Sequence, residues 1–111
     1  MNPSPTLPEV IRLLDARGAR PENAAGIGEF WYEPEVWTLP LSPEARVLYA
    51  GLCSFLGHRE INRKDLRNTL KGRQDTEIAR ALEELVGHDL LVPEAAGTGR
   101  GYEVHPVEGF A

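Results

Sequence analysis

Basic side chains are concentrated in one stretch of the sequence, and this stretch is the feature most able to support binding chemistry. Residues 59–80 hold seven Lys or Arg and four Asp or Glu, whereas residues 1–58 hold four and seven, and residues 81–111 hold one and six. Guanidinium and ammonium groups form charge-assisted hydrogen bonds with phosphate oxygens. A local positive stretch in a chain of net charge −5 is typical of a nucleic-acid-binding surface, although a solvated helix face has the same composition.

Residue types that carry out covalent or metal chemistry form no recognisable group in this sequence. Cys53 has no histidine at a pairing distance along the chain, so we expect a small buried hydrophobic side chain. Together with Cys53, the residues His58, His88 and His105 lack the spacing of zinc ligands. The glycine-rich residues 97–101 precede a predicted strand, which favours a hairpin turn over a phosphate-binding loop. We predict no cofactor and no enzymatic activity.

Length and composition are typical of a small globular protein. The chain has 111 residues, of which 41% are hydrophobic and 26% are charged, which is enough for one core. No run of about 18 apolar residues is present, so no membrane-spanning segment is expected. The N-terminus lacks the pattern of a signal peptide. With one cysteine, these features predict a cytoplasmic protein.

Hydrophobic periodicity predicts three helices between residues 41 and 88. The first has a good N-cap in Ser42 and a proline, Pro43, at its first helical position. The second is capped by Asn62, and the third runs from about Asp75 to His88. A common core is expected from seven apolar side chains: Leu48, Leu52, Leu66, Ile78, Leu82, Leu85 and Leu91.

Short apolar or alternating runs predict three strands, at residues 59–61, 90–92 and 102–105. The last two flank the glycine-rich loop and would form a hairpin. An extended segment is also expected in EFWYEPEVW, and its residues Trp31 and Trp37 could form a binding surface. Aromatic side chains in such a place more often close a small core, which is the interpretation we favour.

Residues 1–28 are predicted to form a helix and a flexible arm, separate from a domain that spans residues 29–111. Four apolar side chains occupy the i, i+3, i+4 and i+7 positions of an amphipathic helix: Leu7, Val10, Ile11 and Leu14. An isolated helix this short is marginal in water, so the stripe must pack on something. It could pack on its own domain, or on a second copy to give a homodimer.

The segment from Pro40 to Pro106 resembles a winged-helix DNA-binding domain. Two stretches carry the resemblance, LSPEARVLYAGLCSFL and INRKDLRNTLKGRQDTEIARALEELVGHDLLV. They are similar to helix-turn-helix domains of plasmid and phage replication initiators, primosome proteins and small bacterial regulators. The resemblance covers 67 of 111 residues, about 60%. It implies an α+β winged helix, with a three-helix helix-turn-helix core and a β-hairpin wing, to which this sequence adds the N-terminal helix and arm.

The resemblance also implies binding of double-stranded DNA, in transcription regulation or replication initiation. The third helix, residues 75–88, would enter the major groove, and the wing, residues 94–101, would lie on the DNA backbone. Gln74 and Arg80 suit bidentate contacts to adenine and guanine. The expected DNA-binding set is Arg63, Lys64, Arg67, Lys71, Arg73, Gln74, Thr76, Arg80 and Arg100.

Two acidic residues depart from the family pattern. Asp75 and Glu77 stand where the family usually has Ser, Thr, Arg or Lys, and carboxylates repel phosphates. Acids in a first helical turn also stabilise the helix dipole, and Asp75 is a good N-cap. If the third helix lies near phosphates, Asp75→Asn and Glu77→Gln should strengthen non-specific binding. These acids leave a second function open, a winged helix used for protein–protein assembly without DNA binding.

Overall fold

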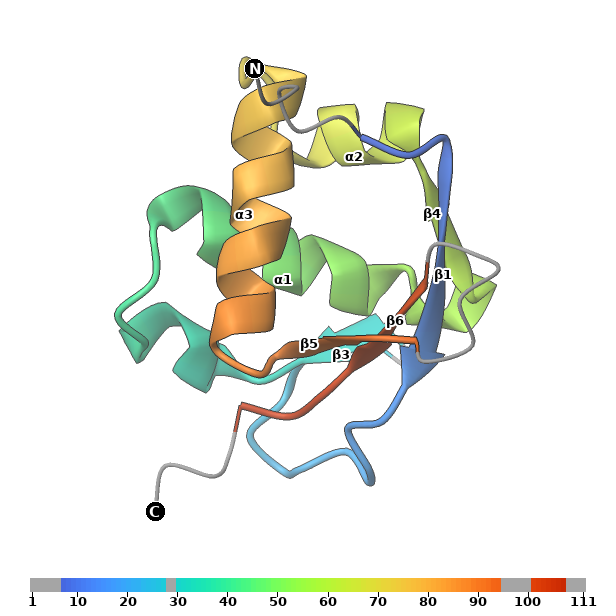
Figure 1. The fold of residues 1–111 in the computed structure, drawn as a ribbon. Coiled ribbons are helices and arrows are strands. Elements are labelled where there is room, and N and C mark those ends of the chain that lie inside the picture. The colour runs from blue at the N-terminus through green and yellow to red at the C-terminus, as the bar shows by residue number, and fades with distance from the viewer. Residues whose placement is uncertain (1–6, 28–29, 95–100, 108–111) are drawn as a thin grey trace.

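The computed structural model describes residues 7–27, 30–94 and 101–107, and Figure 1 shows the arrangement of its elements. Within these residues the chain forms three α-helices, a four-stranded mixed sheet and a two-stranded hairpin. In chain order the elements are β1 (Val10–Asp15), β2 (Ala25–Ile27), β3 (Phe30–Tyr32), η1 (Pro34–Thr38), α1 (Pro43–Ser54), η2 (Leu56–His58), β4 (Glu60–Asn62), α2 (Arg63–Thr69), α3 (Asp75–Gly87), β5 (Leu91–Pro93) and β6 (Gly101–Val104).

The three predicted helices are confirmed, and local capping fixes where they begin. The Ser42 hydroxyl accepts a hydrogen bond from the Ala45 amide at the start of α1. Asn62 Oδ1 accepts from the Asp65 amide at the start of α2. Helix α3 begins at Asp75, but its N-cap is Gln74 and not Asp75. The caps of α1 and α2 each satisfy an amide that has no partner within its own helix.

The four-stranded sheet has the order β4-β1-β6-β5, so its two central strands come from the two ends of the chain (Figure 1). β1 pairs antiparallel with β4 and parallel with β6, while β5 and β6 form an antiparallel pair. The three strands predicted after α1 are confirmed to within one residue at each end. The smaller hairpin of β2 and β3 lies outside this sheet.

The predicted N-terminal helix is wrong, because residues 10–15 form strand β1. The burial pattern has a period of two: Ile11 and Leu13 are fully buried, while Val10 and Leu14 are exposed. The apolar spacing was compatible with both periods because Leu13 is apolar as well. Residues 10–15 form a strand because neighbouring strands pair with both of its edges and so satisfy its backbone hydrogen-bonding groups. A short isolated helix is only marginally stable in water, so this pairing favours the strand.

Because residues 10–15 form a strand, the apolar stripe proposed to mediate a homodimer is divided between the core and the surface. Leu7 and Ile11 belong to the core, with exposed fractions of 3% and 0%. Val10 and Leu14 are 44% and 49% exposed, on the opposite face of the sheet. The four side chains therefore form no common surface, and only Val10 and Leu14 of the four are exposed.

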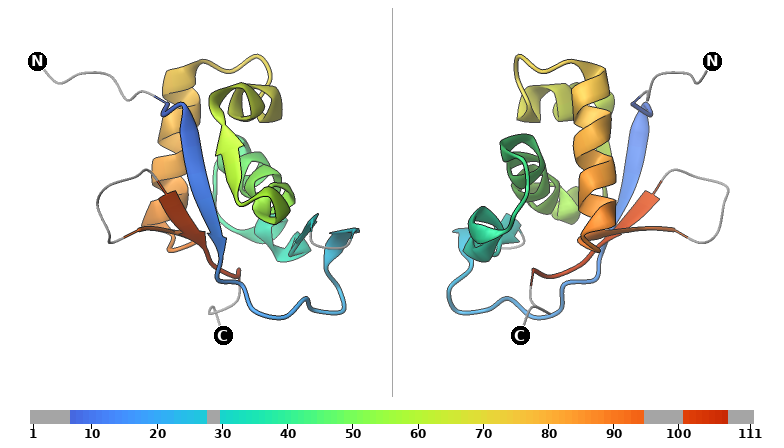
Figure 2. Two further views of the ribbon diagram at one scale, coloured as in Figure 1. Left: turned by 90° about the vertical axis from the view of Figure 1, so that its right-hand side faces the viewer. Right: turned by 60° about the vertical axis from the view of Figure 1, so that its left-hand side comes forward.

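One hydrophobic core joins the helices to one face of the sheet. Figure 2 shows the helices gathered on one side of the strands. All seven side chains predicted to share the core belong to it, and all are at most 4% exposed. The strands contribute Ile11, Leu13, Leu91 and Val104 to the same cluster. The order of helix, short strand, two helices and hairpin is compatible with a winged helix, and β1 is inserted between β4 and β6.

Candidate nucleic-acid interface

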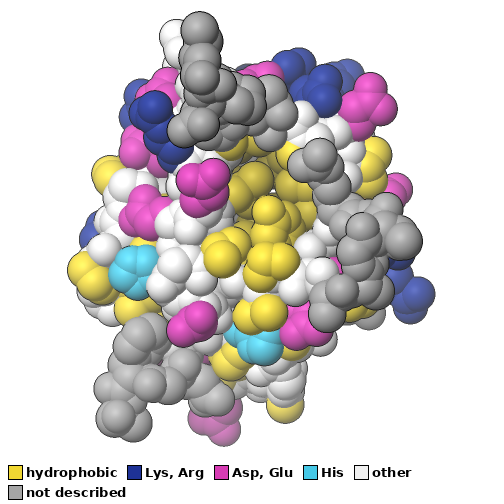
Figure 3. Space-filling view, viewed as in Figure 1, with side chains coloured by type: hydrophobic (Ala, Val, Ile, Leu, Met, Phe, Trp, Pro, Cys, Tyr) yellow, Lys and Arg dark blue, Asp and Glu magenta, His cyan; other side chains and the backbone are white. Residues whose placement is uncertain are grey.

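The predicted DNA-binding residues come together at one end of the molecule, formed by α2, the turn after it and the first turns of α3. Figure 3 shows Lys and Arg side chains along this edge, with Asp and Glu side chains between them. Arg63 and Thr76 are half-buried. The exposed members of the set are Lys64, Arg67, Lys71, Arg73, Gln74 and Arg80. Arg100 and most of the predicted wing lie outside the described residues.

An ion pair between α2 and α3 joins Arg67 to Asp75. The Asp75 carboxylate accepts two hydrogen bonds, from Arg67 Nε at 2.9 Å and from Arg67 Nη2 at 2.6 Å. These bonds hold the pKa of Asp75 below its usual range, so the side chain stays ionised at neutral pH. The acid that seemed least compatible with phosphates is therefore bound to a neighbouring cation.

Two further arginines of the predicted set also have partners within the chain. Arg73 Nη2 lies 3.1 Å from the carboxylate of Glu44, at the start of α1. Arg63 Nη2 donates to the Leu7 carbonyl at 2.9 Å, which ties α2 to the segment before β1. Each contact makes the arginine less available to an external ligand.

Helix α3 buries one side in the core and exposes part of the other: of its thirteen residues, five are buried and three are exposed. Ile78, Ala81 and Leu82 pack into the core, whereas Arg80 and Glu83 are exposed. Thr76 lies four residues before Arg80, on the same side of the helix. Glu77 Oε1 accepts a hydrogen bond from the Gln74 amide at 3.0 Å, so its carboxylate is engaged in capping the helix.

Within the described part of the predicted DNA-binding set, three cations are exposed and form no ion pair with a described residue: Lys64, Lys71 and Arg80. Lys64 belongs to α2 and Lys71 to the turn, so they extend the positive surface beside the Arg67–Asp75 pair. Arg80 borders a shallow pocket of about 250 Å³ whose other lining residues include Glu44, Glu77 and Glu84. This second, acidic rim adjoins the basic surface.

Sequence reasoning missed Glu44 and Glu84 as neighbours of this surface. Glu84 accepts hydrogen bonds from the amide and the hydroxyl of Ser42, both at 2.7 Å, and so joins α3 to the start of α1. Glu44 holds Arg73. Neither pairing has a signal in the sequence, because the partners are 29 and 42 residues apart.

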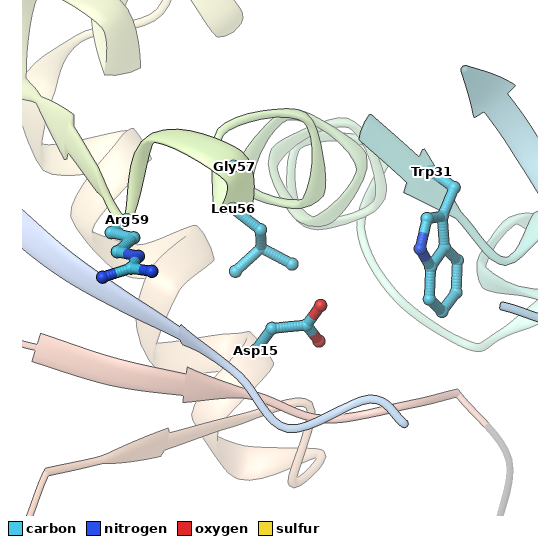
Figure 4. A pocket seen from close by; sticks show the side chains of 5 residues that line it. All are labelled: Asp15, Trp31, Leu56, Gly57 and Arg59. Atoms are coloured by element: carbon cyan, nitrogen blue, oxygen red, sulfur yellow. The ribbon is translucent and has the colours of Figure 1, made fainter. Parts of the chain in front are cut away.

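A second cluster of polar groups surrounds Arg17, in the segment predicted to be an arm. Its guanidinium donates to both carboxylate oxygens of Asp15 and to the Trp31 carbonyl, and lies 3.6 Å from the centre of the Trp31 ring. A pocket of about 260 Å³ beside it is lined by Asp15, Trp31, Leu56, Gly57 and Arg59 (Figure 4). Because Arg17 already occupies the Asp15 carboxylate, this cluster is best explained as a structural link between β1 and β3.

The aromatic and thiol side chains of the sequence divide between core and surface. Trp31 is buried, as favoured, but Trp37 is 42% exposed and meets Tyr32 edge to face. Cys53 is buried as predicted, and burial raises the pKa of its thiol to about 12. A thiol that is protonated at neutral pH is a poor nucleophile.

Comparison of the chain with known protein families, curated proteins and solved structures finds no match. In the part of the chain that the structure describes, no helix is long and apolar enough to cross a membrane. The same residues contain no group of three or more His, Cys, Asp or Glu side chains placed to hold a metal ion. The fold and the charged surface are therefore the basis for assigning a function.

Proposed function

We propose that this protein binds double-stranded DNA as a winged-helix domain, through α2, the following turn and α3. In this arrangement α3 enters the major groove, and Gln74, Thr76 and Arg80 face the base edges. Lys64, Arg67 and Lys71 bind backbone phosphates, with Arg63 and Arg73 at the margin and Arg100 on the wing. Such a domain would serve in transcription regulation or in replication initiation.

The proposal rests on the charged side chains of α2, the following turn and the start of α3. Lys64 and Lys71 are exposed on the same segment as Arg67, and Asp75 is hydrogen-bonded to Arg67. Residues 63–80 hold six basic and three acidic side chains, in a chain whose net charge is −5. A surface of opposite sign to the rest of the molecule orients it toward a polyanion.

The salt dependence of DNA binding tests the proposal. Because Arg63 and Arg73 already have partners, we expect three to four phosphate contacts and a log–log slope of affinity against salt of roughly −2.7 to −3.6. Lys71→Ala should flatten the slope by about one and weaken binding to all sequences alike. Fluorescence polarisation with a labelled random duplex, from low salt upward, measures both quantities.

The matched control is Arg20→Ala. This substitution removes the same charge from the connection between β1 and β2, away from the basic surface (Figure 1). It should leave the slope unchanged. A wild-type protein that binds no duplex at low salt would contradict the proposed function.

A second function, protein–protein assembly without DNA binding, is favoured by a different observation. Figure 3 shows apolar side chains in a hollow between α3 and the strands, on a face with few cations. Val86 and Tyr102 are among the hydrophobic side chains that pack against the core and are only partly buried. If the wild type binds no duplex at low salt and instead associates with a protein, assembly becomes the better explanation.

A further inference from the structure

The Arg67–Asp75 pair leaves part of the arginine open to a ligand. A guanidinium has five N–H donors, and Asp75 engages only Nε–H and one Nη2–H. No described residue accepts from the second Nη2–H or from either Nη1–H, and one hydrogen of each Nη forms an edge that fits two acceptor oxygens at once. The Arg67 side chain is 53% exposed and that of Asp75 38% exposed, so a ligand can approach this edge.

The same pair restricts how Arg67 can move. A free arginine on a helix surface samples many rotamers, and a ligand that binds it must select one of them. Two hydrogen bonds to a carboxylate on another helix fix both the position and the plane of the guanidinium. Lys64 and Lys71 have no comparable restraint from the described residues.

We infer that Asp75 is a positioning residue, which holds the open edge of Arg67 in place for two oxygens of a DNA backbone phosphate. The inference rests on the proposed function and assigns a purpose to the acid at the start of α3. A phosphate is favoured over a guanine because Arg67 belongs to α2, and the first helix of a helix-turn-helix crosses the DNA backbone.

The substitution Asp75→Asn separates positioning from repulsion, because the two give opposite signs. If Asp75 only repels phosphates, removing its charge strengthens binding. If it positions Arg67, binding weakens by about three- to tenfold, although the protein becomes less negative. Asp75→Glu keeps a carboxylate that can reach Arg67 and should restore part of the lost affinity.

Asp65→Asn is the control of equal charge. Asp65 is on α2 and forms no ion pair with any described residue, so its neutralisation should leave affinity equal or slightly higher. The single variant Arg67→Ala and the double variant Arg67→Ala/Asp75→Asn complete a thermodynamic cycle. Without Arg67, the change at position 75 should no longer weaken binding. Circular dichroism confirms that each variant is folded.

The outcomes separate this inference from the proposed function. Absence of wild-type binding to any duplex overturns the proposed function and the inference with it. Wild-type binding that Asp75→Asn strengthens or leaves equal overturns the inference alone. A weaker Asp75→Asn variant whose salt slope is flatter by about one supports a phosphate ligand. An unchanged slope with lost discrimination at one G·C pair overturns the phosphate assignment and points to a guanine.

Discussion

At the scale of single residues, the most heavily bonded charge is Arg17. It is the only buried charged side chain among the described residues, and 1% of its side chain is exposed. Its partners, Asp15 and the Trp31 carbonyl, belong to different sheets, so one guanidinium connects β1 to β3. Such a side chain matters to stability because its partners lose their hydrogen bonds when it is removed.

We expect Arg17→Ala to lower the free energy of unfolding by about 2–3 kcal/mol, since it removes hydrogen bonds to a charged partner and leaves a buried carbonyl unpaired. Urea denaturation followed by tryptophan fluorescence measures this change. Arg20→Ala is the matched control: Arg20 is exposed and its hydrogen bond to the Gly26 carbonyl lies at the surface, so its substitution should change the stability by less than about 0.5 kcal/mol. Equal losses in the two variants would show that the Arg17 cluster contributes nothing specific.

The same cluster predicts how stability depends on pH. The hydrogen bonds from Arg17 lower the pKa of Asp15 below its usual value of about 3.9. A group with a depressed pKa in the folded state stabilises the protein above the unfolded value and loses that contribution as pH falls through the folded one. Wild type should therefore lose stability below about pH 4 more steeply than Asp15→Asn does. Parallel pH profiles of the two proteins would contradict this.

At the scale of elements, α1 and α2 approach each other closely at Gly51. A Cβ atom placed on Gly51 would lie 2.4 Å from Thr69 Cγ2. Thr69 cannot easily turn away, because its hydroxyl donates to the Asp65 carbonyl at 2.8 Å. Glycine in the middle of a helix is normally destabilising, so its presence in α1 is explained by this contact.

We therefore expect Gly51→Ala to destabilise the protein by about 1–3 kcal/mol, although alanine is the better helix former. In a Thr69→Ser background the obstructing methyl group is gone, and Gly51→Ala should instead be neutral or stabilising by up to about 1 kcal/mol. Thermal unfolding of the four proteins measures this change of sign. A stabilising effect in both backgrounds would show that the two helices are not in tight contact.

At the scale of the whole molecule, β1 is a central strand of the sheet although it comes from the first residues of the chain. It pairs with β4 on one side and β6 on the other, and it adds Ile11 and Leu13 to the core. A chain that lacks β1 would leave both neighbouring strands with unpaired edges, and the core would be open on one side.

Deletion of residues 1–15 should therefore abolish cooperative thermal unfolding, as measured by circular dichroism. A truncation that ends before Leu7 is the control and should keep the transition, since it removes none of the described elements. A shortened chain without residues 1–15 that still unfolds cooperatively at the wild-type temperature would show that the remaining strands close the sheet by themselves.

Local sequence patterns determined where two helices begin, which of their side chains are buried, and where the basic stretch lies. Ser42 and Asn62 mark helix starts because a capping side chain needs only the amide three residues ahead. The helices bury the side chains that their periodicity selects, and the position of the basic stretch follows from the sequence alone.

Tertiary structure decided whatever depends on partners distant in the chain. Residues 10–15 become a strand because residues 60–62 and 101–104 lie on either side of them, and no local pattern contains that pairing. Arg67 meets Asp75, and Arg73 meets Glu44, only after the helices have packed. The free energy of such contacts depends on how the elements lie relative to each other, which no local pattern specifies. The sequence determines which residues of this segment are charged, and the fold determines which of these charges face each other and which face solvent.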